Sequence, residues 1–177
     1  MQIIDDWQKR GLTLQLDFIS SEEEQQLLDG IAGTYRPSIG ITSAKYRNSI
    51  HRFGAGDIYK DNIISSMIPA YFSPVISKLI SNKLISGQPD AVTVNEYLAG
   101  QQIHPHIDAV EAGPVITVLS LLSPAVMLFT RGVAGFEVGL PPRSLVQMRD
   151  EIRNDWYHAI LPVEATRYSI VFRGKGC

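Results

Sequence analysis

Hydrophobic positions in the first part of the chain predict one strand and two helices. Residues 11–19, GLTLQLDFI, alternate apolar and polar side chains as a half-buried strand does. The following SEEEQQLLDGIAG, residues 21–33, predicts a helix with Ser21 as its N-cap and Glu24 in the capping-box position. The sequence SPVISKLISNKLI, residues 73–85, predicts a second helix, because a capping serine and a first-turn proline precede apolar residues spaced three and four apart.

From residue 91 onward, short apolar segments of high β-propensity alternate with turn residues. The segments that predict strands are AVTVNEY, VITVLSLL, AVMLFT, GFEVGL, SLVQM, YHAIL and RYSIVFR. None of the intervening stretches shows a helical pattern as clear as the first two. This succession favours a mainly β protein of the α+β class, a sandwich or jelly roll with N-terminal helices packed on one sheet.

Composition indicates a single domain. The 177 residues, 45% of them hydrophobic, suffice for one sizeable core, and no repeat or long linker marks a second domain. A net charge of −2 argues against a surface that binds polyanions throughout, so a nucleic-acid contact would need a local basic patch. Because the chain has one cysteine, no signal-peptide pattern and no apolar run that spans a bilayer, we expect a cytoplasmic protein without membrane contact.

The stretch VNEYLAGQQIHPHIDA, residues 94–109, carries the first candidate chemistry. His106 and Asp108 are two positions apart, so in an extended segment their side chains leave the same face and can bind one ion. Such a triplet is common by chance, and a metal would need a further ligand. His158, in the predicted strand YHAIL, can supply it, and two imidazoles with one carboxylate suit non-haem Fe(II). We expect His104 to shape the loop.

The last predicted strand, RYSIVFR, adds two arginines. Arg167 and Arg173 are six residues apart, an even number that places both on one face of an extended strand. At about 3.3 Å per residue their Cα atoms would lie roughly 20 Å apart. Two long side chains that lean inward could then bind the two ends of a short dicarboxylate. Arginine is suited to this role because its guanidinium binds a carboxylate through two hydrogen bonds. A solvated edge strand would show the same spacing.

Taken together, these elements resemble the signature of the AlkB family of Fe(II)- and 2-oxoglutarate-dependent dioxygenases. The pattern that matches is Asn95-x-Tyr97-x-x-Gly100-x5-His106-x-Asp108, then His158, then Arg167-x5-Arg173. Several separate elements agree in order and spacing, which is far more specific than any one of them. The resemblance covers about residues 11–173, and RFGAGDIY, LPPRSL and HPHIDA look closest to the branch that includes the tRNA wobble-uridine hydroxylases.

The resemblance implies a metal centre and a binding site for the co-substrate. The residues that would hold Fe(II) are His106, Asp108 and His158. The residues that would bind 2-oxoglutarate are Arg167, Tyr97 and Ser169 at its distal carboxylate, and Asn95 and Arg173 near the carboxylate that chelates iron. The implied fold is a double-stranded β-helix, a jelly roll, in agreement with the predicted strands. We expect a metal-binding oxidoreductase.

The reaction that the resemblance implies is the oxidative decarboxylation of 2-oxoglutarate by dioxygen to succinate and carbon dioxide. This step is coupled to hydroxylation of a C–H bond in a second substrate, and the protein orients the keto acid and the target carbon. If that carbon is attached to nitrogen, the hydroxylated product can release an aldehyde. The net result is then dealkylation, such as demethylation of a base.

Substrate selection falls outside these motifs. Residues 36–61 commonly form a lid in this family, so we assign 1–90 to the N-terminal helices and lid and 91–177 to the jelly-roll core of one domain, 1–177. The lid is basic and aromatic, which suits contact with a nucleic acid. Its candidate substrate contacts are Lys45, Tyr46, Arg47, His51, Arg52 and Phe53. A loop that anchors its aromatics in the core and exposes its lysines would have the same composition.

Three hypotheses about function remain open. The first is an oxygenase that hydroxylates or dealkylates a nucleic acid, either a modified tRNA nucleoside or an alkylated base. The second directs the same chemistry at a small molecule or a protein side chain. It is favoured by AVEAGP after the H-x-D pair, in which Glu111 is the lone acid, because acids there help family members to read a damaged base. The third is a jelly-roll binding module without catalysis.

Overall fold

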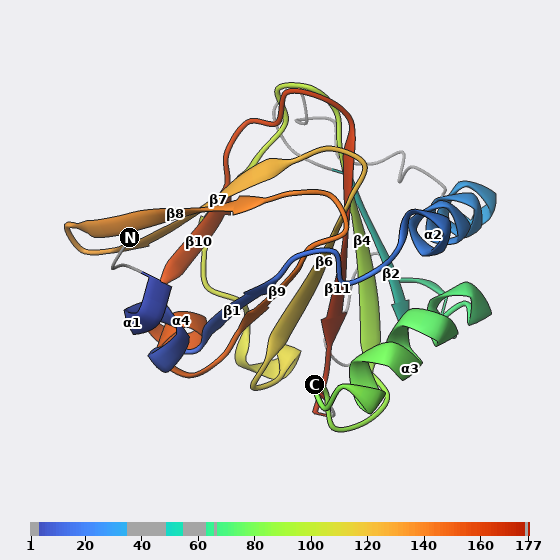
Figure 1. Cartoon of the computed structure of the whole chain (residues 1–177), viewed down its shortest axis with the longest axis horizontal. Helices are drawn as coiled ribbons and strands as arrows, with labels where there is room; N and C mark the ends of the chain where they lie inside the picture. Colours follow the sequence, from blue (N-terminus) through green and yellow to red (C-terminus); the bar gives the residue numbers. More distant parts are fainter. Residues whose placement is uncertain (1–3, 35–48, 55–62, 66, 176) are drawn as a thin grey trace.

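The computed structural model describes residues 4–34, 49–54, 63–65, 67–175 and 177. Within these residues the strands form two sheets, one of seven strands in the order β1-β9-β6-β11-β4-β2-β3 and one of four in the order β5-β10-β7-β8 (Figure 1). Neighbouring strands run antiparallel, except that β2 and β3 are parallel. The arrangement is the predicted mainly β jelly roll.

The larger sheet draws its strands from both halves of the chain. It comprises β1 (Leu12–Gln15), β9 (Leu145–Met148), β6 (Ile116–Leu121), β11 (Arg167–Arg173), β4 (Ala91–Tyr97), β2 (Ser49–Gly54) and β3 (Ile63–Ser65). The smaller sheet comprises β5 (Ile103–His106), β10 (Tyr157–Ile160), β7 (Ala125–Arg131) and β8 (Ala134–Leu140). The first half therefore contributes strands as well as helices, and part of the expected lid, β2, is a sheet strand.

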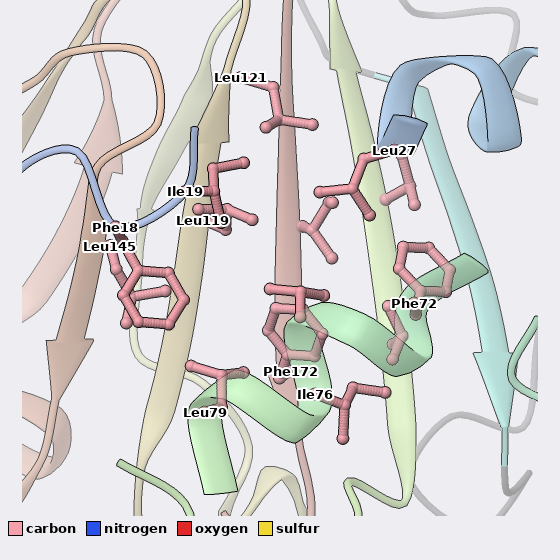
Figure 2. Packing of buried hydrophobic residues seen from close by; sticks show 14 of the residues in the cluster. Phe18, Ile19, Leu27, Phe72, Ile76, Leu79, Leu119, Leu121, Leu145 and Phe172 are labelled. Atoms are coloured by element: carbon pink, nitrogen blue, oxygen red, sulfur yellow. The ribbon is translucent and has the colours of Figure 1, made fainter. Parts of the chain in front are cut away.

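Two of the helices cover the outer face of the larger sheet. The α-helices are α1 (Ile4–Lys9), α2 (Ser21–Thr34), α3 (Ser73–Ser81) and α4 (Asp150–Asp155), and the 3₁₀ helices are η1 (Ala70–Phe72) and η2 (Val110–Ala112). Helices α2 and α3 pack on β4, β6 and β11 through Leu27, Leu79 and Phe172 (Figure 2). A second core, with Val118, Phe129 and others, fills the space between the two sheets. The predicted packing of helices on one sheet is confirmed.

The capping box of α2 lies one residue earlier than predicted. The Glu23 N–H donates to Ser20 Oγ at 3.2 Å, and the Ser20 N–H donates to Glu23 Oε2 at 2.8 Å. The predicted pair of Ser21 and Glu24 is therefore wrong. Glu24 is instead buried, and it accepts a hydrogen bond of 2.8 Å from the Leu122 N–H, which ties the helix to the turn after β6.

The second predicted helix begins at the expected place, but its N-terminus is not capped by a serine side chain as predicted. Ser73 is the first residue of α3, the N-cap is Phe72, and no side chain caps this end because η1 runs directly into the helix. The helix also ends at Ser81, four residues short of the apolar pattern, and Lys83 takes a positive φ of 58°. No helix in the described part of the chain combines the length and hydropathy needed to cross a bilayer.

Candidate active site

Two neighbouring strands of the smaller sheet bring the predicted metal ligands together. His106 on β5 and His158 on β10 are paired in register, and their ring centroids lie 4.3 Å apart. Asp108 lies just past the end of β5. One ligand atom from each of these three residues lies within 4.8 Å of the other two. The residues therefore form a cluster of the size that one metal ion requires.

Burial of one imidazole and a hydrogen bond to the other favour metal binding. Burial lowers the pKa of His158 to about 4, against the opposing effect of Asp108, so this ring is neutral at pH 7. His106 Nδ1 lies 2.9 Å from the carbonyl oxygen of His104. Because a carbonyl can only accept, Nδ1 of His106 donates this hydrogen bond, which leaves Nε2 as the ring nitrogen that can bind a metal ion. A hydrogen bond of this kind fixes the tautomer of metal-binding histidines.

The carboxylate of Asp108 is held at one oxygen and open at the other. Arg173 Nη2 donates to Oδ1 at 2.8 Å. The second oxygen, Oδ2, is buried 3.6 Å from His158 Nε2 and accepts no hydrogen bond from any described residue. A buried carboxylate oxygen without a donor is costly, and a cation between it and the two imidazoles would offset that cost. The donor set therefore fits a divalent metal ion such as Fe(II).

The three residues of this cluster line a cavity of about 490 Å³, and Arg167 lines the same cavity. Arg167 is fully buried, and its Nη2 donates to Ser120 Oγ at 3.1 Å. Its Nε and Nη1 are also buried and have no hydrogen-bond partner among the described residues. Burial lowers the pKa of the guanidinium, yet arginine stays charged in proteins. A buried cation with two unused donor atoms suits an anionic ligand.

The cavity face of β4 and β11 is polar where the co-substrate is expected. Arg167, Ser169 and Arg173 all line the cavity, so the predicted common face of this strand is confirmed. Asn95 is the register partner of Ser169 on β4, and its Nδ2 donates to Ser169 Oγ at 3.2 Å. Tyr97 is paired with Arg167 in the same register and also lines the cavity. The structure thus brings the five predicted 2-oxoglutarate residues to one cavity.

The candidate substrate residues separate into three groups. Arg52 on β2 lines the cavity. His51 and Phe53, its neighbours along the strand, are buried on the opposite face, where Phe53 packs against Phe72 with ring centroids 5.9 Å apart. Phe53 belongs to the helix-covered core, and neither side chain is in the lining of the cavity as described. The remaining candidates lie outside the described residues: Lys45, Tyr46 and Arg47.

Two residues at this site were not predicted. Ser120, which accepts the hydrogen bond from Arg167, is one of two polar residues in β6, the other being Thr117, and a polar residue among apolar ones was an available signal. Arg153 on α4 donates to the backbone carbonyl of Asp108. No sequence signal marked it, because α4 has six residues and shows no helical period.

Comparison with known proteins identifies the family of this chain. The family model of the 2OG-Fe(II) oxygenase superfamily matches residues 55–173, which include all three residues of the metal cluster. The chain belongs to this superfamily. As a 2OG-Fe(II) oxygenase it is a dioxygenase enzyme that uses Fe(II), 2-oxoglutarate and dioxygen, and His106, Asp108 and His158 form a fitting iron site.

Relatives of this oxygenase place it in the AlkB family. It is 33% identical over 159 residues to the tRNA (carboxymethyluridine(34)-5-O)-methyltransferase alkbh8 of Xenopus tropicalis, which is 86% of this chain but 25% of the frog protein. It is 31% identical over 183 residues to Uncharacterized protein L905 of Acanthamoeba polyphaga mimivirus, at 92% and 84% coverage of the two chains. The solved structure of OsALKBH1 shares the fold with a TM-score of 0.67 at 16% identity, covering 92% of this chain and 97% of that one.

Proposed function

We propose that this oxygenase hydroxylates or oxidatively dealkylates a nucleic-acid substrate, either a modified tRNA nucleoside or an alkylated base. The observation that carries the chemistry is the shared cavity of the His106, Asp108 and His158 cluster and the buried Arg167. The substrate class rests on the name of the frog relative, which concerns a tRNA uridine. That name describes methyl transfer, and this chain spans a quarter of the frog protein, so only the substrate class is carried over.

The chain's own residues would divide the metal and co-substrate work between them. The imidazoles of His106 and His158 and Oδ2 of Asp108 would hold Fe(II), while Arg173 fixes the orientation of the carboxylate by its hydrogen bond to Oδ1. Fe(II) would supply the reductive activation of dioxygen that is coupled to decarboxylation of 2-oxoglutarate. Because a positively charged Arg173 lies beside the cluster, it would also attract the carboxylate end of the keto acid next to the metal.

The distal carboxylate of 2-oxoglutarate would bind to Arg167. Its unused Nε and Nη1 offer the paired donors that a carboxylate accepts, and Tyr97 and Ser169 lie beside it on the cavity wall. Asn95, held by Ser169, would contact the keto-acid end together with Arg173. Water would be excluded from this part of the site by the apolar side chains of the inter-sheet core.

The experiment that tests this proposal measures succinate release from 2-oxoglutarate with Fe(II) and oxygen, with and without total tRNA. Asp108→Ala should abolish succinate release, and Glu164→Ala, which changes an exposed carboxylate, should leave it unchanged. Mass spectrometry of the digested tRNA should find a nucleoside that has gained one oxygen atom or lost an alkyl group.

The possible outcomes separate the hypotheses. Succinate release that tRNA stimulates, and that Asp108→Ala eliminates, supports the nucleic-acid proposal. Iron-dependent succinate release that tRNA leaves unchanged, without any altered nucleoside, contradicts the proposed substrate class and points to a small molecule or a protein side chain. Absence of succinate under every condition contradicts the assignment of the site itself.

A further inference from the structure

Arg153 is a buried cation whose contacts are all neutral backbone carbonyls. Its side chain extends from α4, and the residue is 4% exposed. Nη1 donates to the carbonyl of Asp108 at 2.9 Å, Nη2 to that of Ala109 at 2.6 Å, and Nε to that of Gly113 at 3.1 Å. No carboxylate forms an ion pair with it in the described part of the chain. All three nitrogens of the planar guanidinium are used, and no other side chain offers donors in that geometry.

These carbonyls belong to one loop, residues 107–115, whose second residue is the proposed metal ligand Asp108. The far side of the loop is attached to the end of β11, where the Gly174 N–H donates to the carbonyl of Ala112 at 3.1 Å. Gly113 has a positive φ of 97°, and a Cβ there would lie 2.2 Å from the carbonyl oxygen of Gly174, so the approach is too close for any other residue. The loop is therefore held between α4 and β11.

Helix α4 is itself fixed to the rest of the fold. The Ile152 N–H donates to the carbonyl of Arg10 at 3.1 Å, next to the start of β1. At the C-terminal end of the helix, Trp156 packs edge-on against Trp7, with ring centroids 5.1 Å apart. A short helix with these attachments is a rigid support, so a side chain on it can set the position of the loop that it touches.

We propose that Arg153 is a positioning residue that sets the geometry of the metal site through the backbone of Asp108. The inference rests on the metal-ligand assignment proposed above. Two arginines then define where Asp108 lies, because Arg173 holds its Oδ1 and Arg153 holds its backbone carbonyl. Together they leave Oδ2 directed at His158 Nε2, 3.6 Å away. Without Arg153, the buried carbonyl of Asp108 and the part-buried carbonyls of Ala109 and Gly113 lose this donor, and the loop can relax away from the histidines.

Cobalt(II) titration of the metal-free protein tests this role without any need for turnover. Arg153→Met should weaken Co(II) binding by about 10- to 100-fold, the range typical for partners that orient a metal ligand, and should change the visible ligand-field spectrum. Arg153→Lys keeps the charge but cannot reach three carbonyls at once, so it should also weaken binding. The matched control is Arg131→Gln, because Arg131 contacts α4 through Glu151 and Asp155 but is half exposed and does not touch the loop.

A double-mutant cycle distinguishes positioning from general loosening. In the Asp108→Ala background, Arg153→Met should cause no further loss of Co(II) affinity, because the ligand that it positions is gone. Wild-type affinity and spectrum in both Arg153 variants would overturn the inference, as would an equal loss in the Asp108→Ala background. If Arg153→Met does not fold, Arg153→Lys carries the same comparison.

The two proposals fail in different ways. Wild-type protein that binds no Co(II), or Asp108→Ala protein that binds it as well as wild type, overturns the metal assignment and the role of Arg153 with it. Intact Co(II) binding that depends on Arg153, combined with no effect of tRNA on succinate release, supports the positioning role and contradicts the proposed substrate class alone.

Discussion

The guanidinium carbon of Arg167 lies 5.0 Å from the ring centre of Tyr97, its register partner on the neighbouring strand β4. Burial raises the pKa of Tyr97, even though the adjacent cation of Arg167 acts in the opposite direction. The phenol is therefore protonated at neutral pH and gives Arg167 a neutral aromatic wall rather than a counter-ion. The positive charge of this buried arginine remains available to an anion that enters from solution.

Replacement of this cation should remove the co-substrate's main anchor. We expect Arg167→Met to raise the Kd for 2-oxoglutarate by about 10- to 100-fold, because a hydrogen bond to a charged group contributes about 1.5–3 kcal/mol. With Co(II) bound, 2-oxoglutarate at about 100 times the wild-type Kd stabilises by about 2.7 kcal/mol, which raises Tm by roughly 5–10 °C for a chain of this size.

Thermal melts at that fixed concentration provide the measurement. The Tm shift in Arg167→Met should be about half that of wild type or less. Arg131→Met, which removes an exposed arginine on β7, serves as the control and should show the full shift. An undiminished shift in Arg167→Met would mean that 2-oxoglutarate does not bind at this arginine.

The buried imidazole of His158 should make the metal-free protein less stable in acid. Its pKa is about 4 in the folded protein against an ordinary value of 6.5, because burial penalises the charged ring. Between these values the unfolded chain holds a proton that the native state does not, so stability is lost as the pH falls from about 6.5 towards 4. At 1.36 kcal/mol per pKa unit the loss is roughly 3 kcal/mol at most.

Urea unfolding between pH 7 and pH 4 measures this loss. His158→Asn removes the group, so its free energy of unfolding should fall less over this range than that of wild type, by up to about 3 kcal/mol. His104→Asn changes an exposed histidine of the same region and should follow the wild-type curve. Parallel curves for wild type and His158→Asn would contradict the prediction.

The architecture followed from the sequence because its hydrophobic pattern is strong where the sheets form. All seven segments predicted as strands after residue 91 contain a strand, whereas β5 (Ile103–His106) lies outside the predicted segments. The metal cluster was also predictable. Its ligands occupy neighbouring positions in the fold because β5 and β10 pair with His106 opposite His158. The common face of Arg167 and Arg173 was predictable too, because side chains an even number of residues apart on one strand point to the same side.

The missed features have physical reasons. Helix α4 is too short to show a helical period, so Arg153 could not be placed opposite the Asp108 loop. Strand β2 places Arg52 on the cavity face and His51 on the helix-covered face. The alternation of side chains along a strand predicts that neighbouring residues lie on opposite faces. It does not predict which face lines the cavity, since that depends on where the helices pack.

The capping error at α2 leads to a direct test of the structure. Two serines followed by three glutamates allow two capping frames one residue apart, and the structure uses Ser20 with Glu23. We expect Ser20→Ala to lower the free energy of unfolding by about 1 kcal/mol, the usual cost of losing an N-cap. Ser21→Ala, in the frame that the sequence favoured, should change it by less than about 0.5 kcal/mol. Urea unfolding of both variants measures the difference, and equal effects would contradict the assigned frame.

Arg52 is the described substrate candidate that reaches the cavity, so it should carry a measurable part of tRNA affinity. It lies on β2 opposite Thr93, which also lines the cavity, and it is partly exposed. If its guanidinium contacts a phosphate, Arg52→Gln should weaken tRNA binding across sequences and reduce the slope of log affinity against log salt by about 1. Filter binding of total tRNA at several salt concentrations, with Co(II) and 2-oxoglutarate present, measures that slope.

The control for this prediction is Arg131→Gln, which removes the same charge from an exposed position outside the cavity lining. An unchanged slope in Arg52→Gln with a weaker affinity would indicate a contact with a base instead of a phosphate, because a neutral contact releases no counterion. A higher KM for 2-oxoglutarate with unchanged tRNA affinity would assign Arg52 to the co-substrate. Since the net charge of the chain is −2, any salt-dependent affinity must come from local cations such as Arg52. The slope of log affinity against log salt reports how many phosphates these cations neutralise.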